Sequence, residues 1–266
     1  MSKDPPIRFL QKRPPWTDWM PRLIQWYLMG LVEMETNGTE AHIPKRGPVV
    51  VHFCPHSGWM EAVLIDKCFE RVGRPAILWM TKAENRGLPR WLLGDRFIGI
   101  DREQPEPRVM RILHRVLAPP PEGASISPAP ALGTAIEGTR FGNPDDPTDV
   151  RTLGPFKTGL VRLSMRTQTP IVAAVTLGTD SLASNLEEVY KGEGTLAAFR
   201  ELRRLRANRC PVQVRFLPLY TAHLAPRGED GAPDGPPRVR AEWHVARLRE
   251  QMVAEILALE PDYPTG

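Results

Sequence analysis

Short apolar runs alternate with amphipathic stretches along most of the 266-residue chain, and this alternation constrains its fold more than any other feature. Six runs, several rich in β-branched residues and most bounded by glycine, proline or charge, are predicted to be strands: 48–53, 76–80, 97–101, 133–137, 170–177 and 211–216. Helices are expected at 57–71, 107–117, 156–167, 194–206 and 239–259. This alternation predicts an α/β fold, a single domain with a largely parallel central sheet flanked by helices.

Residues 1–44 differ from the rest, and we expect them to form a helical segment ahead of an α/β domain at 45–266. The stretch 16–31 is apolar on most sides and holds three tryptophans and a tyrosine. Pro21 suits the first turn of a helix that we expect to run to about Glu35. Its apolar part reaches only about 22 Å, short of a hydrocarbon core of roughly 30 Å. We predict that it lies at a membrane interface; packing on the protein's own core is the alternative.

Charge and cysteine content bear on location and partners. The sequence has 35 Lys plus Arg against 31 Asp plus Glu, a net charge of +4, which permits attraction to anionic lipid. No aromatic-basic pattern or recognised module indicates nucleic acid, so we expect no nucleic-acid partner. Three scattered cysteines and the lack of an export signal predict a reduced, cytoplasmic protein, peripherally associated with the inner face of the cell membrane.

A first candidate for chemistry follows the run 48–53, where His56 and Glu61 stand five residues apart. On one continuous helix these side chains would point about 140° apart, so they can meet only if His56 lies in the loop before the helix. A carboxylate on one ring nitrogen fixes the tautomer of a histidine and leaves the other nitrogen as a general base. The spacing alone is equally consistent with a loop histidine that caps the helix.

A second candidate is the tetrapeptide Glu137-Gly138-Thr139-Arg140 at the end of the run 133–137. Glycine at a strand end lets the backbone approach a ligand, while threonine and arginine donate hydrogen bonds to phosphate. The tetrapeptide therefore favours a phosphate-binding turn. A turn closed by a surface salt bridge is the alternative.

In order along the chain, these motifs resemble those of the glycerolipid acyltransferase family, which includes bacterial 1-acyl-sn-glycerol-3-phosphate acyltransferases. HSGWME at 56–61 is similar to the family's His-x-x-x-x-Asp block, and FIGIDR at 97–102 to its strand ending in Asp-Arg. AIEGTR at 135–140 is similar to its Phe-Pro-Glu-Gly-Thr-Arg block. The segment 154–175 is similar to its phenylalanine-lysine-glycine helix and the strand that follows.

The resemblance implies a reaction and a role for each matching residue. His56 would deprotonate a lipid hydroxyl, which attacks an acyl thioester of CoA or acyl carrier protein, and Glu61 would orient the imidazole. The acceptor would be lysophosphatidic acid or a related lysolipid. The residues implied to bind substrate are Lys82, Arg102, Glu137, Gly138, Thr139 and Arg140. Neither a metal nor a cofactor is implied, because the thioester is a co-substrate.

Departures from the family pattern leave a second function open. Glu61 replaces the usual aspartate and so moves the carboxylate by about 1.5 Å. Ala135-Ile136 replaces Phe-Pro ahead of Glu137. A lipid-binding protein that keeps the fold with weak or no turnover is therefore the alternative to an active enzyme.

The pattern His52-x-Cys54-x-His56 also admits a zinc site, because alternate residues of a strand share one face. Pro55 and the lack of a distal ligand pair count against that interpretation. A nucleophilic role for Cys54 needs an electropositive setting that the sequence does not indicate, so we interpret Cys54 as a small packed residue.

Overall fold

The computed structural model describes residues 19–56, 60–74, 77–82, 97–100, 107–117, 130–137, 153–180, 182 and 195–265. Its helices include α1 (Trp19–Met29), α2 (Met60–Arg71), α4 (Pro107–Leu117), α5 (Gly159–Thr167), α7 (Thr195–Ala207) and α8 (Pro237–Leu259). The strands of the described residues are β1 (Val32–Glu35), β2 (Val49–Cys54), β3 (Leu78–Lys82), β4 (Phe97–Ile100), β5 (Ala131–Ala135), β6 (Ile171–Leu177) and β7 (Cys210–Phe216). The boundaries of the elements from β2 onward lie within three residues of those predicted.

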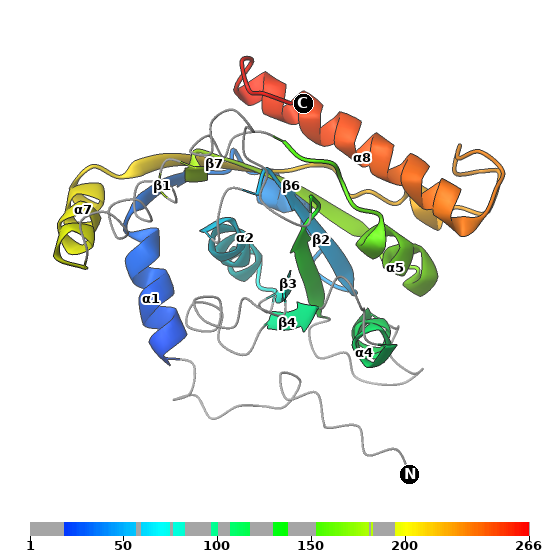
Figure 1. Ribbon diagram of the computed structural model, residues 1–266, viewed down its shortest axis with the longest axis horizontal. Coiled ribbons are helices and arrows are strands. Elements are labelled where there is room, and N and C mark those ends of the chain that lie inside the picture. Colours follow the sequence, from blue (N-terminus) through cyan, green and yellow to red (C-terminus); the bar gives the residue numbers. More distant parts are fainter. Residues whose placement is uncertain are drawn as a thin grey trace, which may run out of the picture.

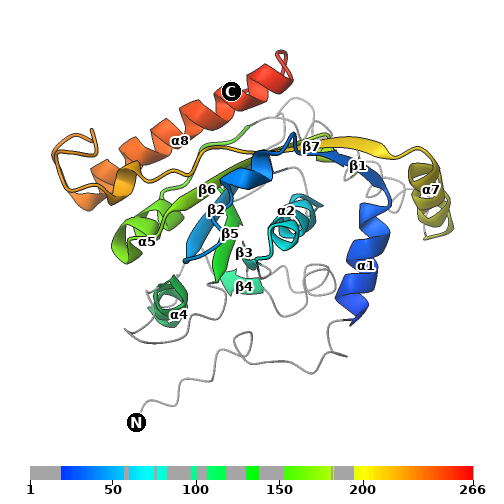
Figure 2. The same ribbon diagram turned by 180° about the vertical axis from the view of Figure 1, so that it is seen from behind.

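These strands form one sheet in the order β1-β7-β6-β2-β5-β3-β4 (Figures 1 and 2). From β6 through β4 every neighbouring pair is parallel. β7 runs antiparallel to β6, and β1 runs parallel to β7. The expected α/β fold with a largely parallel sheet is confirmed. Its five parallel strands bring their carboxyl ends to a single edge, where the residues that follow β2, β3 and β5 were predicted to act.

The central strand β2 divides its side chains between two cores. Val49, Val51 and Phe53 belong to a core shared with α1, α2 and α7. Val50 and Cys54 belong to a second core shared with α4, α5 and α8. Figures 1 and 2 show α2 and α8 on opposite sides of the sheet. Because both faces are covered, β2 is buried along its whole length and is apolar except for His52.

The N-terminal segment differs from the expectation of one helix reaching about Glu35. α1 ends at Met29, and Val32–Glu35 form the edge strand β1. Glycine at position 30 favours a helix end, and the open edge of β7 offers backbone groups for pairing. Leu28 and Leu31 are buried in the first core. The sheet therefore begins inside the segment 1–44, at Val32, instead of after it.

A buried polar network of Tyr220, His223, Asp230, Arg240 and His244, here called the α8 network, fastens α8 to the sheet. The Tyr220 hydroxyl lies 2.7 Å from Nδ1 of His244, whose Nε2 lies 3.1 Å from Asp230 Oδ2. Arg240 Nε donates to the same carboxylate oxygen at 2.8 Å. The His223 ring stacks on Tyr220 with centroids 5.6 Å apart. The Asp230 carboxylate is thus contacted by Arg240 and His244, which lie on successive turns of α8.

Candidate active site

Three neighbouring parallel strands each deliver one polar residue to the same edge of the sheet. His56 lies two residues beyond the end of β2, Glu137 two beyond β5, and Thr179 two beyond β6. β2 pairs with β5 on one side and with β6 on the other. In open α/β sheets, ligands bind outside the carboxyl ends of the strands. They bind where the connections from two neighbouring strands run to opposite faces of the sheet. The predicted base His56 stands at such a point.

Glu137 joins the loop after β2 to the loop before α5. Its Oε1 accepts the backbone N–H of His56 at 3.0 Å, and its Oε2 accepts that of Gly154 at 2.8 Å. Burial raises the pKa of Glu137 to about 7, and the charge of Glu61 adds to this effect while the two N–H groups oppose it. A role in substrate binding was predicted for Glu137. The buried carboxylate holds two backbones at the site. Contact with a substrate stays a prediction.

Glu61 lies in the first turn of α2, where a carboxylate is favoured by the helix dipole. Its side chain is fully buried, and its Oε1 accepts a hydrogen bond from the Thr179 hydroxyl at 2.8 Å. Thr179 stands 118 residues further along the chain and was not predicted from the sequence. No local pattern marks it, because only the pairing of β6 with β2 brings it to Glu61.

His56 is half-buried and keeps part of its surface open. Its ring meets Phe53 edge to face with centroids 5.7 Å apart, and Phe53 in turn meets Trp79 in the same way at 5.6 Å. These contacts support one side of the imidazole. With the backbone held by Glu137, the position of His56 is fixed from two directions.

The remaining predicted residues divide into two groups. Lys82 is the last residue of β3, so the backbone brings it to the same edge of the sheet as His56. Arg102, Gly138, Thr139 and Arg140 lie outside the described residues. Their roles in binding the acceptor stay predictions.

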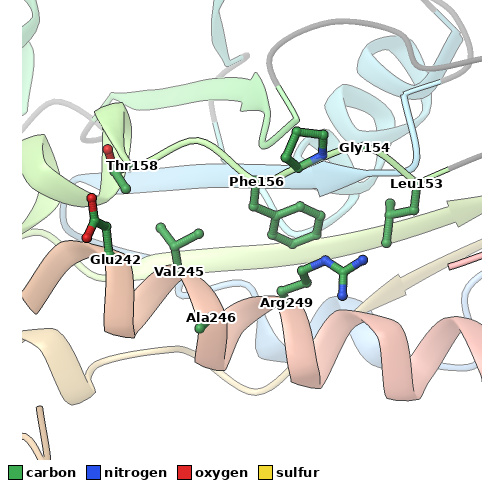
Figure 3. A pocket seen from close by; sticks show the side chains of 9 residues that line it. Leu153, Gly154, Phe156, Thr158, Glu242, Val245, Ala246 and Arg249 are labelled. Carbon is green, nitrogen blue, oxygen red and sulfur yellow. The ribbon is translucent and has the colours of Figure 1, made fainter. Parts of the chain in front are cut away.

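A groove of about 510 Å³ borders the site between α8 and the loop that precedes α5 (Figure 3). Its lining is mostly apolar, with Phe156 and Val245 facing it, and Arg249 reaches along it from α8. Arg249 Nη2 donates to the carbonyl of Thr265 at 2.5 Å, and its guanidinium lies 6.0 Å from the centre of the Phe156 ring. Gly154 belongs both to this groove and to the Glu137 contact.

The cysteine and zinc alternatives find no support in the described residues. Burial raises the pKa of the Cys54 thiol well above its usual value, which disfavours the thiolate that a nucleophile needs. Among the residues described, no three His, Cys, Asp or Glu side chains are placed to hold a metal ion. Cys54 packs in the second core, as predicted.

Comparison with known proteins gives a likeness to solved structures but no match in sequence. No protein-family model matches the chain, and no curated protein matches it. The fold is similar to that of the 1-acyl-sn-glycerophosphate (LPA) acyltransferase PlsC from Thermotoga maritima, with a TM-score of 0.49 and 17% identity. The match covers 92% of this chain and 85% of that one. Likeness at this level does not define an activity, so the function proposed below rests on the residues at the sheet edge.

Proposed function

We propose that this protein transfers a fatty acyl group from an acyl thioester to a lipid hydroxyl. The observation that carries the proposal is the convergence of His56, Glu61 and Glu137 at the carboxyl edge of the parallel sheet. A histidine that is supported on one side, half-open on the other and close to buried carboxylates suits a general base. Its place in the resembling His-x4-acid and Glu-Gly-Thr-Arg blocks favours acyl transfer over other base-catalysed reactions.

The reaction follows from the weakness of an alcohol as a nucleophile. His56 takes the proton of the acceptor hydroxyl as its oxygen attacks the thioester carbonyl carbon. The tetrahedral intermediate collapses by breaking the carbon–sulfur bond. The thiolate leaves and takes up the proton held by His56, so the enzyme returns to its starting state. Glu61 orients the imidazole. Glu137 fixes the position of the loop that carries His56 relative to the loop at Gly154.

The donor is acyl-CoA or acyl carrier protein, and lysophosphatidic acid or a related lysolipid is the acceptor that the motifs favour. Arg102, Arg140 and Lys82 are proposed to bind its phosphate, because arginine forks and lysine charges suit that group. Arg140→Ala should raise the acceptor KM with little change in kcat, since phosphate is held alike in the ground and transition states. Steady-state kinetics with phosphorylated and unphosphorylated acceptors measures this difference.

A membrane surface is the proposed site of action, on the cytoplasmic face. None of the helices in the described residues is long and apolar enough to cross a bilayer. α1 exposes Leu23 and Trp26, which are 50% and 62% accessible, and Arg206 of α7 stacks on the Trp26 ring at 5.4 Å. Exposed apolar side chains beside a cation suit the lipid headgroup region.

Leu23→Ser with Trp26→Ser should therefore reduce binding to anionic vesicles in a sedimentation assay. Val239→Ser, which replaces an exposed apolar residue on α8, is the matched control and should leave binding unchanged. Point substitutions are preferable to deleting residues 1–35, because that deletion also removes the edge strand β1. Equal binding by the double variant would assign α1 to core packing alone.

The direct test of the reaction is thiol release from a panel of acyl thioesters with and without lysolipid acceptors. Wild-type protein should release thiol in an acceptor-dependent way and form the acylated lipid. His56→Ala should lower the rate by about 10²–10⁴-fold, the usual effect of losing a general base. Unchanged turnover in His56→Ala would remove His56 from the mechanism.

The alternative is a lipid-binding protein with weak or no turnover. The observation that favours it is Glu61, which stands where the resembling family usually has aspartate. Under this alternative, lysolipid binds tightly while no thioester of the panel yields product. Isothermal titration with the same lysolipids, combined with the thiol assay, separates the two functions.

A further inference from the structure

Thr179 reaches the carboxylate of the proposed site from a different strand than the one that carries His56. Its hydroxyl donates to Glu61 Oε1 at 2.8 Å, and the two residues are 1% and 0% exposed. A hydrogen bond from a buried hydroxyl to a carboxylate is strong and directional. We propose that Thr179 is a positioning residue that holds Glu61 in place for His56, and that its hydroxyl is matched to the length of a glutamate side chain. This inference rests on the proposed function of His56 and Glu61.

The backbone at Gly178 places Thr179 where it can act. Gly178 has a φ of 87°, in the left-handed region that favours glycine. A Cβ atom there would lie 2.4 Å from the carbonyl oxygen of Pro211 on β7, so no larger residue fits without displacing the backbone. The chain thus turns immediately after β6 and presents Thr179 to the first turn of α2. The position of the Thr179 hydroxyl therefore follows from the end of β6 and the turn at Gly178.

The contact between Thr179 and Glu61 suits glutamate and not aspartate. Shortening the side chain by one methylene withdraws the carboxylate by about 1.5 Å. If α2 keeps its place and the carboxylate withdraws along the line of the hydrogen bond, the 2.8 Å contact lengthens to about 4.3 Å, beyond hydrogen-bond range. Glu61→Asp therefore loses the Thr179 contact, although aspartate is the usual residue of the family that this motif resembles. Thr179 gives a physical reason for glutamate at this position.

A double-mutant cycle in turnover tests the match. Thr179→Val keeps the shape of the side chain and removes its donor, so kcat should fall by about 10–100-fold, the effect of one hydrogen bond to a charged group. The acceptor KM should change by less than about twofold, because the contact acts through the imidazole and not on the substrate. Thr179→Ser keeps the donor and should restore most of the rate.

The two substitutions should not be additive. Glu61→Asp already lacks the contact, so adding Thr179→Val to it should cost no more than about twofold further in kcat. Multiplicative effects of Glu61→Asp and Thr179→Val would overturn the match. So would a wild-type kcat in Thr179→Val, or a Thr179→Ser variant as slow as Thr179→Val.

A second readout separates this inference from the proposed function. ¹⁵N NMR of the imidazole nitrogens, with His56 assigned by its loss in His56→Gln, reports the tautomer of His56 without turnover. A single tautomer in wild type and Thr179→Ser, but a mixture in Thr179→Val, supports positioning even if no thioester is turned over. The same tautomer distribution in all three proteins would overturn positioning, whether or not wild type is an acyltransferase.

Discussion

His52 and His56 stand four residues apart, on and just beyond the same strand, yet they differ in exposure and in the contacts that hold them. His52 lies within β2, is 1% exposed, and neither of its ring nitrogens has a hydrogen-bond partner in the described residues. Burial, with a smaller effect of His223, lowers the pKa of His52 to about 3, so its ring is neutral. His56 lies beyond the strand end, half-open, with its backbone held by Glu137. The strand end separates a packing histidine from a candidate base.

The same contrast holds between the sheet edge and the α8 network. In the network, His244 and Asp230 pair with both side chains fully buried, and Tyr220 and Arg240 occupy their remaining sides. At the edge, buried protein groups hold Glu61 and Glu137, while the histidine keeps an open surface. A histidine beside a carboxylate is therefore not enough to identify an active site. Access to the imidazole decides between structure and chemistry.

The largest effect on stability should come from breaking the α8 network. Burial alone would raise the pKa of Asp230, but hydrogen bonds from Arg240, the Ala232 N–H and His244 together lower it. Asp230→Ala leaves Arg240 and the buried His244 without their acceptor and should cost about 3–5 kcal/mol in urea unfolding. Activity per folded molecule should not change. Arg247→Ala breaks an exposed ion pair with Glu250 on the same helix and should cost no more than about 1 kcal/mol. Equal costs would mean that Asp230 is not a structural anchor.

Glu137→Gln should affect activity more than stability. An amide nitrogen cannot accept a hydrogen bond, so either His56 or Gly154 loses the acceptor of its backbone N–H. We expect kcat to fall by about 10–100-fold through misplacement of the His56 loop. The pKa of Glu137 is raised to about 7, so the wild-type rate should also fall as Glu137 is protonated below that pH. Glu137→Gln should lose this part of the pH–rate profile; the exposed control Glu250→Gln should keep it.

Acid should weaken the molecule through its buried histidines. Burial lowers the pKa of His52 to about 3 and that of His223 to about 4, whereas both titrate near 6.5 when unfolded. Stability from each is thus complete above about pH 6.5 and falls by about 1.4 kcal/mol per pH unit below it, until the folded pKa is reached. Glu137, with a raised pKa, acts in the opposite direction between about pH 7 and 4.5. His52→Leu should remove one histidine's share of this slope in unfolding experiments from pH 7 to 5. An unaltered slope would show that His52 is hydrated or paired in solution.

The smallest effect is expected at Cys54. Cys54→Ala removes a buried sulfur from the second core and should change the thiol-release rate by less than about twofold. Some loss of stability is expected from the smaller side chain. A collapse of turnover with stability intact would instead favour a covalent acyl-cysteine, which intact mass spectrometry detects.

The sequence predicted the sheet well because covered parallel strands leave a plain signal. Runs such as 170–177 are apolar except for Thr176, and β6 is buried at every position. The end of α1 is harder to predict from the sequence, because the strand β1 reads Val-Glu-Met-Glu. This strand forms by pairing with the open edge of β7. On α8, Met252 and Ile256 are buried, but the apolar Trp243 and Ala246 of the same helix are not. The buried face of α8 includes His244, which is held by the α8 network. An apolar pattern does not predict that a histidine lies on the buried face.

The candidate site shows the same division between local and long-range information. His56 and Glu61 were found because they are near one another in the chain and belong to a spaced motif. Glu137 was found by its tetrapeptide, but its contacts with the backbones of His56 and Gly154 depend on the pairing of β5 with β2. Thr179 was missed because its only mark is spatial. Strand order, which the sequence did not establish, converts separate motifs into one site.

The central claim is that the histidine beyond the end of β2, and not the one within it, is the base of an acyl transfer. The measurement that tests it most directly is acceptor-dependent thiol release from acyl-CoA with lysophosphatidic acid, compared among wild type, His56→Ala and His52→Leu at equal folded fraction. We predict that His52→Leu turns over within about twofold of wild type while His56→Ala loses about 10²–10⁴-fold. Equal rates in wild type and His56→Ala, or a loss confined to His52→Leu, would contradict it.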